Sequence, residues 1–130
     1  MPMMFETECY AIRGAVYEVY SKMGQGFAEE VYQEALEMEL ADRGIPFVSQ
    51  QRLQIRYKER LLSKVYIPDF VCYGKIIVEI KAVHALSPEH GAQVINYLRA
   101  TSLPMGLLVN FGSFPKSEIE TFTNRTDFKS

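Results

Sequence analysis

The chain has 130 residues, of which 48% are hydrophobic and 23% are charged, and its net charge at pH 7 is −2. This composition is typical of one globular domain and excludes a disordered or low-complexity chain. The slightly negative charge argues against a protein that binds nucleic acid through a uniformly basic surface. The N-terminus lacks the pattern of a secretory signal, no apolar run could cross a bilayer, and Cys9 and Cys72 show no metal-ligand spacing, so we expect a cytoplasmic protein without membrane contact.

Two helices are expected first. Apolar residues recur at spacings of three and four over residues 4–22, and Gly24 and Gly26 interrupt this pattern. A second helix is expected over residues 27–43, because the glycine and proline of the segment 44–46 are typical of a helix end.

After residue 46 the pattern changes to the alternation of strands. We expect strands over residues 47–58, 62–72, 75–83 and 104–112, a helix over 88–102 before the last strand, and a final helix over 116–123. The first three strands can be joined by hairpins, whereas the helix before the fourth indicates a crossover to a parallel neighbour. The sequence therefore predicts an α/β fold in one domain, residues 1–130, with a four-stranded mixed sheet flanked by helices in the order α-α-β-β-β-α-β.

Three charged side chains, Asp69, Glu79 and Lys81, lie inside the apolar runs of the second and third of these strands. Because side chains alternate along a strand, Glu79 and Lys81 share one face. Asp69 joins them on that face only if the turn around Gly74 has an odd number of residues or a bulge, and a two-residue turn would place the two acids on opposite faces. Two converging carboxylates favour a hard cation such as Mg²⁺, with the lysine beside an activated water, although an ion pair at the sheet edge explains the pattern equally well.

Two helices carry further candidates. Glu29 lies at the margin of the apolar stripe of the second helix, from which it can reach the sheet, whereas Glu30 is expected to be a surface acid. Gln93 and Tyr97 are four residues apart and share a face of the third helix. Gln93 can hold a water or a phosphate there, and an ordinary surface amide is an equal alternative.

Charge is distributed unevenly along the chain. Residues 23–42 carry six acids and no lysine or arginine. The segment 52–64 has one acid and five basic residues, which are Arg52, Arg56, Lys58, Arg60 and Lys64. These five are candidates for contact with nucleic-acid phosphates, and a solvated strand face is the alternative.

The order of three short motifs resembles a known family. The segment GFAEEVY, with Gly26, Glu29 and Tyr32, is similar to the signature of the GxxExxY proteins. The PDF and VEIK segments resemble the split signature of the PD-(D/E)XK nuclease superfamily, and QVINY resembles the QxxxY motif of its RecB-like branch. The resemblance extends over residues 5–114 and implies a restriction-endonuclease-like core.

The resemblance implies a role for each matching residue. Asp69, Glu79 and the backbone carbonyl of Ile80 would bind Mg²⁺, for which Mn²⁺ would substitute, and Glu29 would complete the metal shell. Lys81 would act on the nucleophilic water, and Gln93 would orient the site or contact substrate. Tyr97, Tyr32 and Gly26 would support these residues.

The expected function is Mg²⁺-dependent hydrolysis of phosphodiester bonds, with DNA as the expected nucleic acid. Ends, flaps, junctions or single strands are expected as substrates because one small domain has little surface for reading a long sequence. A homodimer through the first helix is a further expectation. The alternative is a catalytically silent binding or adaptor protein that keeps the nuclease fold.

Overall fold

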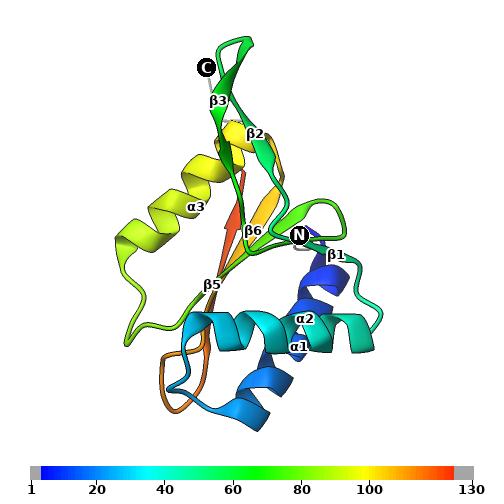
Figure 1. Ribbon diagram of the computed structural model, residues 1–130, viewed down its shortest axis with the longest axis vertical. Helices are drawn as coiled ribbons and strands as arrows, with labels where there is room; N and C mark the ends of the chain where they lie inside the picture. Colours follow the sequence, from blue (N-terminus) through cyan, green and yellow to red (C-terminus); the bar gives the residue numbers. More distant parts are fainter. Residues whose placement is uncertain (1–3, 125–130) are drawn as a thin grey trace.

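The computed structural model describes residues 4–124 and contains three helices and seven strands in that range (Figure 1). The helices are α1 (Glu6–Met23), α2 (Glu29–Asp42) and α3 (Pro88–Thr101). The strands are β1 (Phe47–Ser49), β2 (Leu53–Tyr57), β3 (Arg60–Tyr66), β4 (Phe70–Cys72), β5 (Ile76–Lys81), β6 (Met105–Asn110) and β7 (Glu118–Thr123). Within the described residues, no helix has the length and hydrophobicity that are needed to cross a membrane.

A mixed sheet of five strands forms the centre of the fold, in the order β1-β4-β5-β6-β7. The crossover through α3 makes β5 and β6 parallel, as expected, and the other neighbours pair antiparallel. Helices α1 and α2 pack together on one side of the sheet, and α3 lies on the other side (Figure 1). The predicted α/β class with a mixed sheet between helices is therefore confirmed, with five strands in the sheet instead of four.

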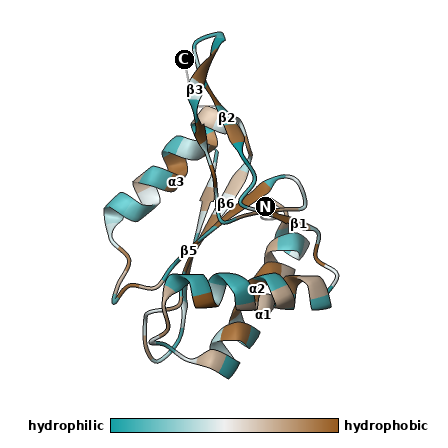
Figure 2. Cartoon of the chain, viewed as in Figure 1, coloured by the Kyte–Doolittle hydropathy of each residue, from teal (hydrophilic) through white to brown (hydrophobic). Residues whose placement is uncertain are grey.

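The alternation of β5 divides the core between the two faces of the sheet. Ile76, Val78 and Ile80 are buried against the α1 and α2 side, whereas Ile77 is buried with Val94 and other residues on the α3 side. Figure 2 shows hydrophobic residues along the central strands, whereas α2 carries hydrophilic and hydrophobic residues side by side. Because Glu79 and Lys81 alternate with Val78 and Ile80, they lie on the α3 side of the sheet.

Two of the predicted strands are each divided in the structure. The segment 47–58 becomes β1 and β2, and the segment 62–72 becomes β3 and β4. Gln50 has a φ of 54°, outside the extended region, and Pro68 cannot donate to a ladder, so neither segment continues as one strand. The outer halves, β2 and β3, form a separate two-stranded hairpin, here called the arm (residues 53–66), which projects from the domain (Figure 1).

The predicted helix over residues 116–123 is wrong, because this segment forms the edge strand β7. β7 pairs antiparallel with β6 along its whole length, from Met105 opposite Thr123 to Asn110 opposite Glu118. Pairing with a fully buried strand satisfies the backbone of both segments and outweighs the local helix preference of the glutamates in β7. The third helix, by contrast, is confirmed within one residue of its predicted end.

Candidate active site

The turn between β4 and β5 decides whether the two acids share a face. Residues 73–75 form a three-residue turn in which Tyr73 has a φ of 57° and Gly74 a φ of 71°. The ladder pairs Phe70 with Val78 as its last pair, and continuing this register by one residue sets Asp69 opposite Glu79. The prediction of an odd-length turn is therefore confirmed.

The carboxylates of Asp69 and Glu79 lie where the ladder between β4 and β5 ends. The backbone N–H of Ile80 donates to Oδ2 of Asp69 at 2.8 Å, and the N–H of Asp69 donates to Oε1 of Glu79 at 3.2 Å. Each carboxylate thus accepts a backbone hydrogen bond beside the other strand. These two bonds hold the acids next to each other at the point where the strands separate.

Glu79 is an unusually weak acid because it is buried. Desolvation raises the pKa of Glu79 to about 7, and the neighbouring Asp69 also raises it. The hydroxyl of Tyr66, which donates a hydrogen bond to Oε2 of Glu79, opposes this rise. A carboxyl group with a raised pKa beside another acid is typical of sites that perform chemistry or bind a cation.

A short loop before α2 positions Glu29, the first residue of that helix. Gly26 has a φ of 110°, a conformation that residues with a side chain rarely adopt. The buried hydroxyl of Tyr32 donates to the carbonyl of Gly24 and accepts the N–H of Phe27 at 3.3 Å, so it fastens both ends of this loop. Gly26 and Tyr32 therefore both determine the conformation of the loop that places Glu29 at the start of α2.

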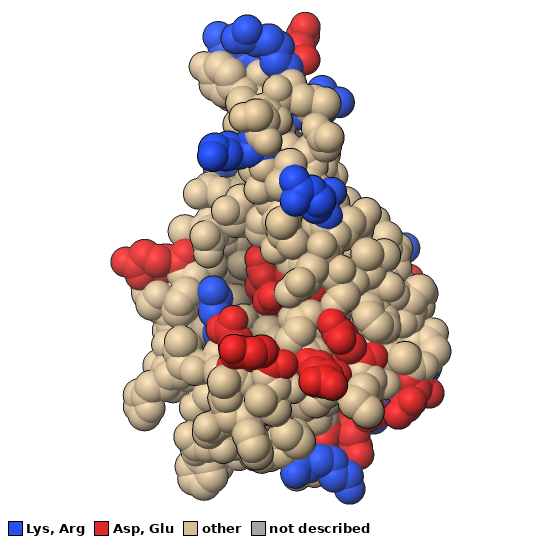
Figure 3. Space-filling view, in the orientation of Figure 1, with Lys and Arg blue, Asp and Glu red and all other residues tan. Residues whose placement is uncertain are grey.

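The side chain of Glu29 is exposed at the edge of a hollow of about 170 Å³. The hollow is lined by Glu29, Glu30, Gln33, Gln50, Asp69 and Ile80. Desolvation raises the pKa of Glu29, the positive charge of Lys81 lowers it, and the negative charge of Asp69 raises it. Helix α2 therefore places the carboxyl group of Glu29 close enough to Lys81 and Asp69 for their charges to shift its pKa. Figure 3 shows acidic side chains gathered around a hollow on this side of the molecule.

Three polar residues of the hollow were not candidates from the sequence. Gln33 donates from Nε2 to Oγ of Ser49 at 3.0 Å and to the carbonyl of Asp69 at 3.4 Å, which links α2 to the site. Gln50 and Glu30 reach the hollow through the loop after β1 and the first turn of α2. Glu30 is exposed, as expected of a surface acid, but it also lines the hollow, which the sequence did not predict. The helical period gave no signal for Glu30 and Gln33, because their place depends on how α2 crosses the sheet, and Gln50 lies in a loop outside any periodic pattern.

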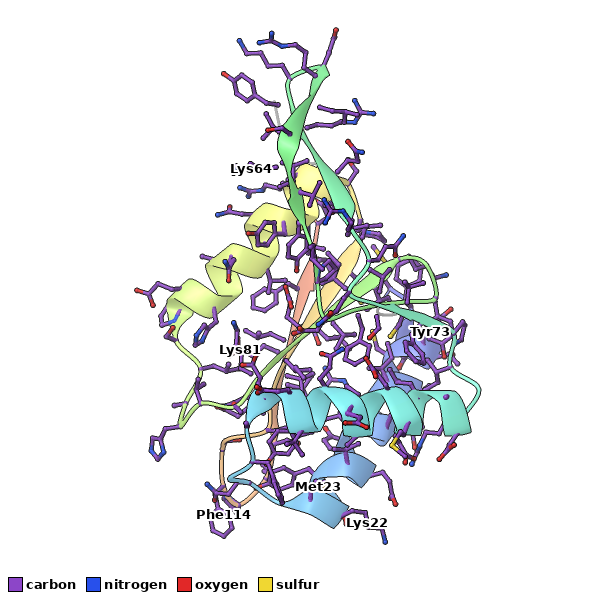
Figure 4. The ribbon with its side chains drawn as sticks, in the orientation of Figure 1. Lys22, Met23, Lys64, Tyr73, Lys81 and Phe114 are labelled. Carbon is purple, nitrogen blue, oxygen red and sulfur yellow. The ribbon has the colours of Figure 1, made fainter. Side chains whose placement is uncertain are left out.

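Lys81 ends β5 on the same face as Glu79. Its side chain is half-buried, and it is absent from the ion pairs within 4 Å that the structure contains between residues 4 and 124. In Figure 4 it extends from β5 on the side between α2 and α3. An ammonium group in this position is available to a bound anion or water instead of being neutralised by a fixed partner.

The two residues of α3 differ in their relation to the site. Tyr97 stacks on Tyr66 with ring centroids 3.6 Å apart and an interplanar angle of 5°, so it is joined to Glu79 through Tyr66. Gln93 is exposed one turn earlier on the helix and makes no side-chain hydrogen bond within the described part of the chain. The structure thus connects Tyr97 to the carboxylates and leaves Gln93 free toward solvent.

The sequence matches a known protein family. The family model described as the PD-(D/E)XK nuclease superfamily matches residues 6–122, a range that includes every site residue described above. The chain belongs to the PD-(D/E)XK nuclease superfamily. The crystal structure of SSO0001 is similar, with a TM-score of 0.58 and 17% sequence identity, and the match covers 92% of this chain and 59% of SSO0001. At this identity the likeness shows the fold alone. Comparison with curated proteins found no match.

Enzymes of the PD-(D/E)XK nuclease superfamily typically use divalent metal ions, and the donors present here fit such an ion. No three His, Cys, Asp or Glu side chains in residues 4–124 lie close enough to hold an ion together. Mg²⁺, however, is usually bound by one or two carboxylates together with waters and substrate phosphate. The adjacent carboxylates of Asp69 and Glu79 match this requirement, with Glu29 outside the immediate pair.

Proposed function

We propose that this chain is a metal-dependent nuclease that hydrolyses phosphodiester bonds in DNA. The observation that carries the proposal is that Asp69 and Glu79 lie side by side just past the end of the β4–β5 ladder, joined by backbone hydrogen bonds, with Lys81 on the same face. A bound cation stabilises two acids that are held side by side, and a nearby lysine without an ion-pair partner among the described residues complements the negative charge of a reacting phosphate.

Each residue has a defined task in this proposal. Asp69, Glu79 and the backbone carbonyl of Ile80 would hold Mg²⁺ or Mn²⁺, and Glu29 would act on the same ion through a water. When bound, the ion supplies a more acidic water and stabilises charge on the phosphate oxygens. Lys81 orients the attacking water and stabilises the developing negative charge, while Gln93 contacts the substrate beside it.

Replacing Gly26 by Ala tests whether the loop before α2 positions Glu29. We expect a loss of about 1–3 kcal/mol in the free energy of unfolding, because the φ of 110° is strained for alanine while the added Cβ meets nothing within 4 Å. Cleavage is expected to fall about 10- to 100-fold, because a displaced first turn of α2 moves Glu29 from the metal site. Urea unfolding and initial cleavage rates measure the two effects.

Gly44→Ala is the matched control for this substitution. Gly44 also has a positive φ, of 70°, with open space around the added Cβ, and it lies at the other end of α2. It should cost similar stability and leave the cleavage rate close to wild type. Equal loss of activity in both variants would contradict a positioning role for the Gly26 loop.

The arm supplies the proposed surface for nucleic-acid phosphates. All five basic residues of the segment 52–64 are exposed, and Lys64 projects from the arm in Figure 4. Figure 3 shows basic side chains along the projecting arm and acidic ones around the hollow below it. Tyr57, 55% exposed near the arm's turn, offers a ring on which an unpaired base can stack. This combination favours ends, flaps, junctions or single strands as substrates.

Removing charge from the arm tests this surface. For the triple variant Arg56→Ser, Lys58→Ser and Arg60→Ser, we expect the slope of log affinity against log salt to become shallower by about 2 to 3. Each bound phosphate releases about one counterion, so the change in slope measures how many phosphates these three side chains bind. Fluorescence anisotropy with a labelled flap substrate in EDTA measures binding without cleavage.

The control variant combines Lys22→Ser with Lys116→Ser, which removes exposed cations outside the arm. It should leave the slope of log affinity against log salt unchanged. A similar change in both variants would contradict specific binding by the arm.

A homodimer through α1 is part of the same proposal. Tyr10 and Tyr17, two turns apart on α1, are 79% and 51% exposed, which leaves an apolar surface on this helix. Light scattering measures the mass of the purified protein in solution, and a dimer is expected to show twice the 14.9 kDa of one chain.

One assay tests the function as a whole. The purified protein is incubated with Mg²⁺, Mn²⁺ or EDTA and a panel of linear, circular, single-stranded, flapped and four-way-junction DNA, with matching RNA. Cleavage that requires metal supports the proposal, and the preferred substrate identifies the structure that the enzyme acts on. Absence of both cleavage and metal binding would overturn it.

A further inference from the structure

Tyr66 occupies a position that links three parts of the molecule. It is the last residue of β3 and therefore ends the arm, three residues before Asp69. Its side chain is only 5% exposed and packs with Ile77, Val94, Leu98 and Leu108 on the α3 side of the sheet. A tyrosine that served only to fill this core would gain nothing from its hydroxyl group, which must find a partner when it is buried.

The partner of this hydroxyl is the acid that the proposed function assigns to the metal. The Tyr66 hydroxyl donates to Oε2 of Glu79, while Oε1 of Glu79 accepts the N–H of Asp69. One hydrogen bond on each oxygen determines the rotation of the carboxylate about its last bond. Each carboxylate oxygen has a second lone pair, so both remain able to bind a cation.

The ring of Tyr66 is itself held from the other side. Tyr97 of α3 stacks on it in a nearly parallel orientation, with 3.6 Å between the centroids. Leu53, the cross-strand neighbour of Tyr66 at the base of the arm, packs against the same group of residues. The ring therefore has little freedom to rotate, and the hydroxyl is fixed relative to the sheet.

We propose that Tyr66 is a positioning residue that orients the carboxylate of Glu79 for metal binding, with Tyr97 holding its ring in place. The inference rests on the proposed function, because it assigns Glu79 to the metal. Groups that orient metal ligands typically change metal affinity about 10- to 100-fold when they are removed. The role of Tyr97 at the site is then indirect, through the stacked ring.

The test uses Tyr66→Phe, which removes the hydroxyl and keeps the ring that stacks on Tyr97. Calorimetric titration with Mn²⁺ in the absence of nucleic acid is expected to show a Kd about 10- to 100-fold weaker than wild type. The signal of the Glu79 carboxyl carbon, followed by NMR in the metal-free protein, is expected to shift, because the carboxylate loses one of its two fixed hydrogen bonds. Neither measurement depends on cleavage.

Tyr20→Phe is the matched control. The Tyr20 hydroxyl donates to the carbonyl of Ser113 at 2.7 Å, so this variant also loses one tyrosine hydrogen bond, at a place away from Glu79. It should bind Mn²⁺ like wild type and leave the Glu79 signal unchanged. An equal loss of affinity in both variants would show a general effect of stability and overturn the inference.

A second variant, Tyr97→Leu, removes the stacked ring but keeps the Tyr66 hydroxyl. It is expected to weaken Mn²⁺ binding less than Tyr66→Phe, because the hydroxyl can still reach Glu79 from a less restricted ring. Wild-type Mn²⁺ affinity in Tyr66→Phe would overturn the role of Tyr66 and leave the proposed nuclease function intact. Failure of the wild-type protein to bind Mn²⁺ would overturn the metal site and this inference together.

Discussion

Replacing Asp69 by Ala is expected to lower metal-dependent cleavage by at least about 1000-fold, because the metal loses one of its two carboxylate ligands and the site loses a negative charge. The substitution also leaves the N–H of Ile80 without the oxygen that accepts it at 2.8 Å. This loss costs about 1–3 kcal/mol in the free energy of unfolding, which is smaller than the stability of a typical domain. Initial cleavage rates at saturating Mg²⁺ measure the effect.

Two further variants separate chemistry from folding. Asp69→Asn keeps an oxygen that can accept the N–H of Ile80 but removes the charge, so it should be inactive with nearly wild-type stability. Asp42→Ala removes an exposed carboxylate at the other end of α2 and should cleave at the wild-type rate. Cleavage by Asp69→Asn at the wild-type rate would refute the assignment of Asp69 to the metal.

The metal-free protein is expected to lose about 3 kcal/mol of stability through Glu79 as the pH rises from 4.5 to 7. The pKa of this carboxyl group is raised from 4.5 to about 7 in the folded protein, mainly by burial. Between these values the folded protein binds the proton and the unfolded chain releases it, so stability falls with rising pH. Well above pH 7 both states are ionised and the loss is complete.

Urea unfolding in EDTA at several pH values, for wild type and Glu79→Gln, isolates this contribution. Glu79→Gln does not titrate at this position, so the stability of wild type relative to the variant should decrease across the window. Other groups with raised pKa values, such as Glu29, titrate in both proteins and cancel in the difference. Mg²⁺ at pH 8 should restore stability to wild type more than to Glu79→Gln, because a bound cation compensates the buried charge. A difference that stays constant with pH would contradict the raised pKa.

Local patterns in the sequence were sufficient for most of the elements. The helices α1, α2 and α3 follow from the three- and four-residue spacing of their apolar residues, since this period directly determines which side of a helix is buried. The alternation in β5 likewise predicts that Glu79 and Lys81 share a face. These relations hold within a single element and need no knowledge of its neighbours.

Pairing between distant segments accounts for the errors. The segment 118–123 becomes a strand because the edge of β6 is available beside it, and no local pattern shows that edge. The arm separates from the sheet because β1 and β4 pair with each other, and β4 with β5, while β2 and β3 pair only with each other. The competition between such pairings depends on long-range interactions, which local propensity does not contain.

The sequence by itself determined that Asp69, Glu79 and Lys81 could form a charged site, because side chains alternate along strands and the motifs occur in the expected order. The sequence left open whether the side chains of Asp69 and Glu79 lie close together. The tertiary structure decided this through the three-residue turn at 73–75, which sets Asp69 opposite Glu79, and through the crossing of α2, which brings Glu29 to the same hollow. The role of Tyr66 is entirely a product of the tertiary fold, because its interactions with Glu79 and Tyr97 join residues 13 and 31 positions away in the chain.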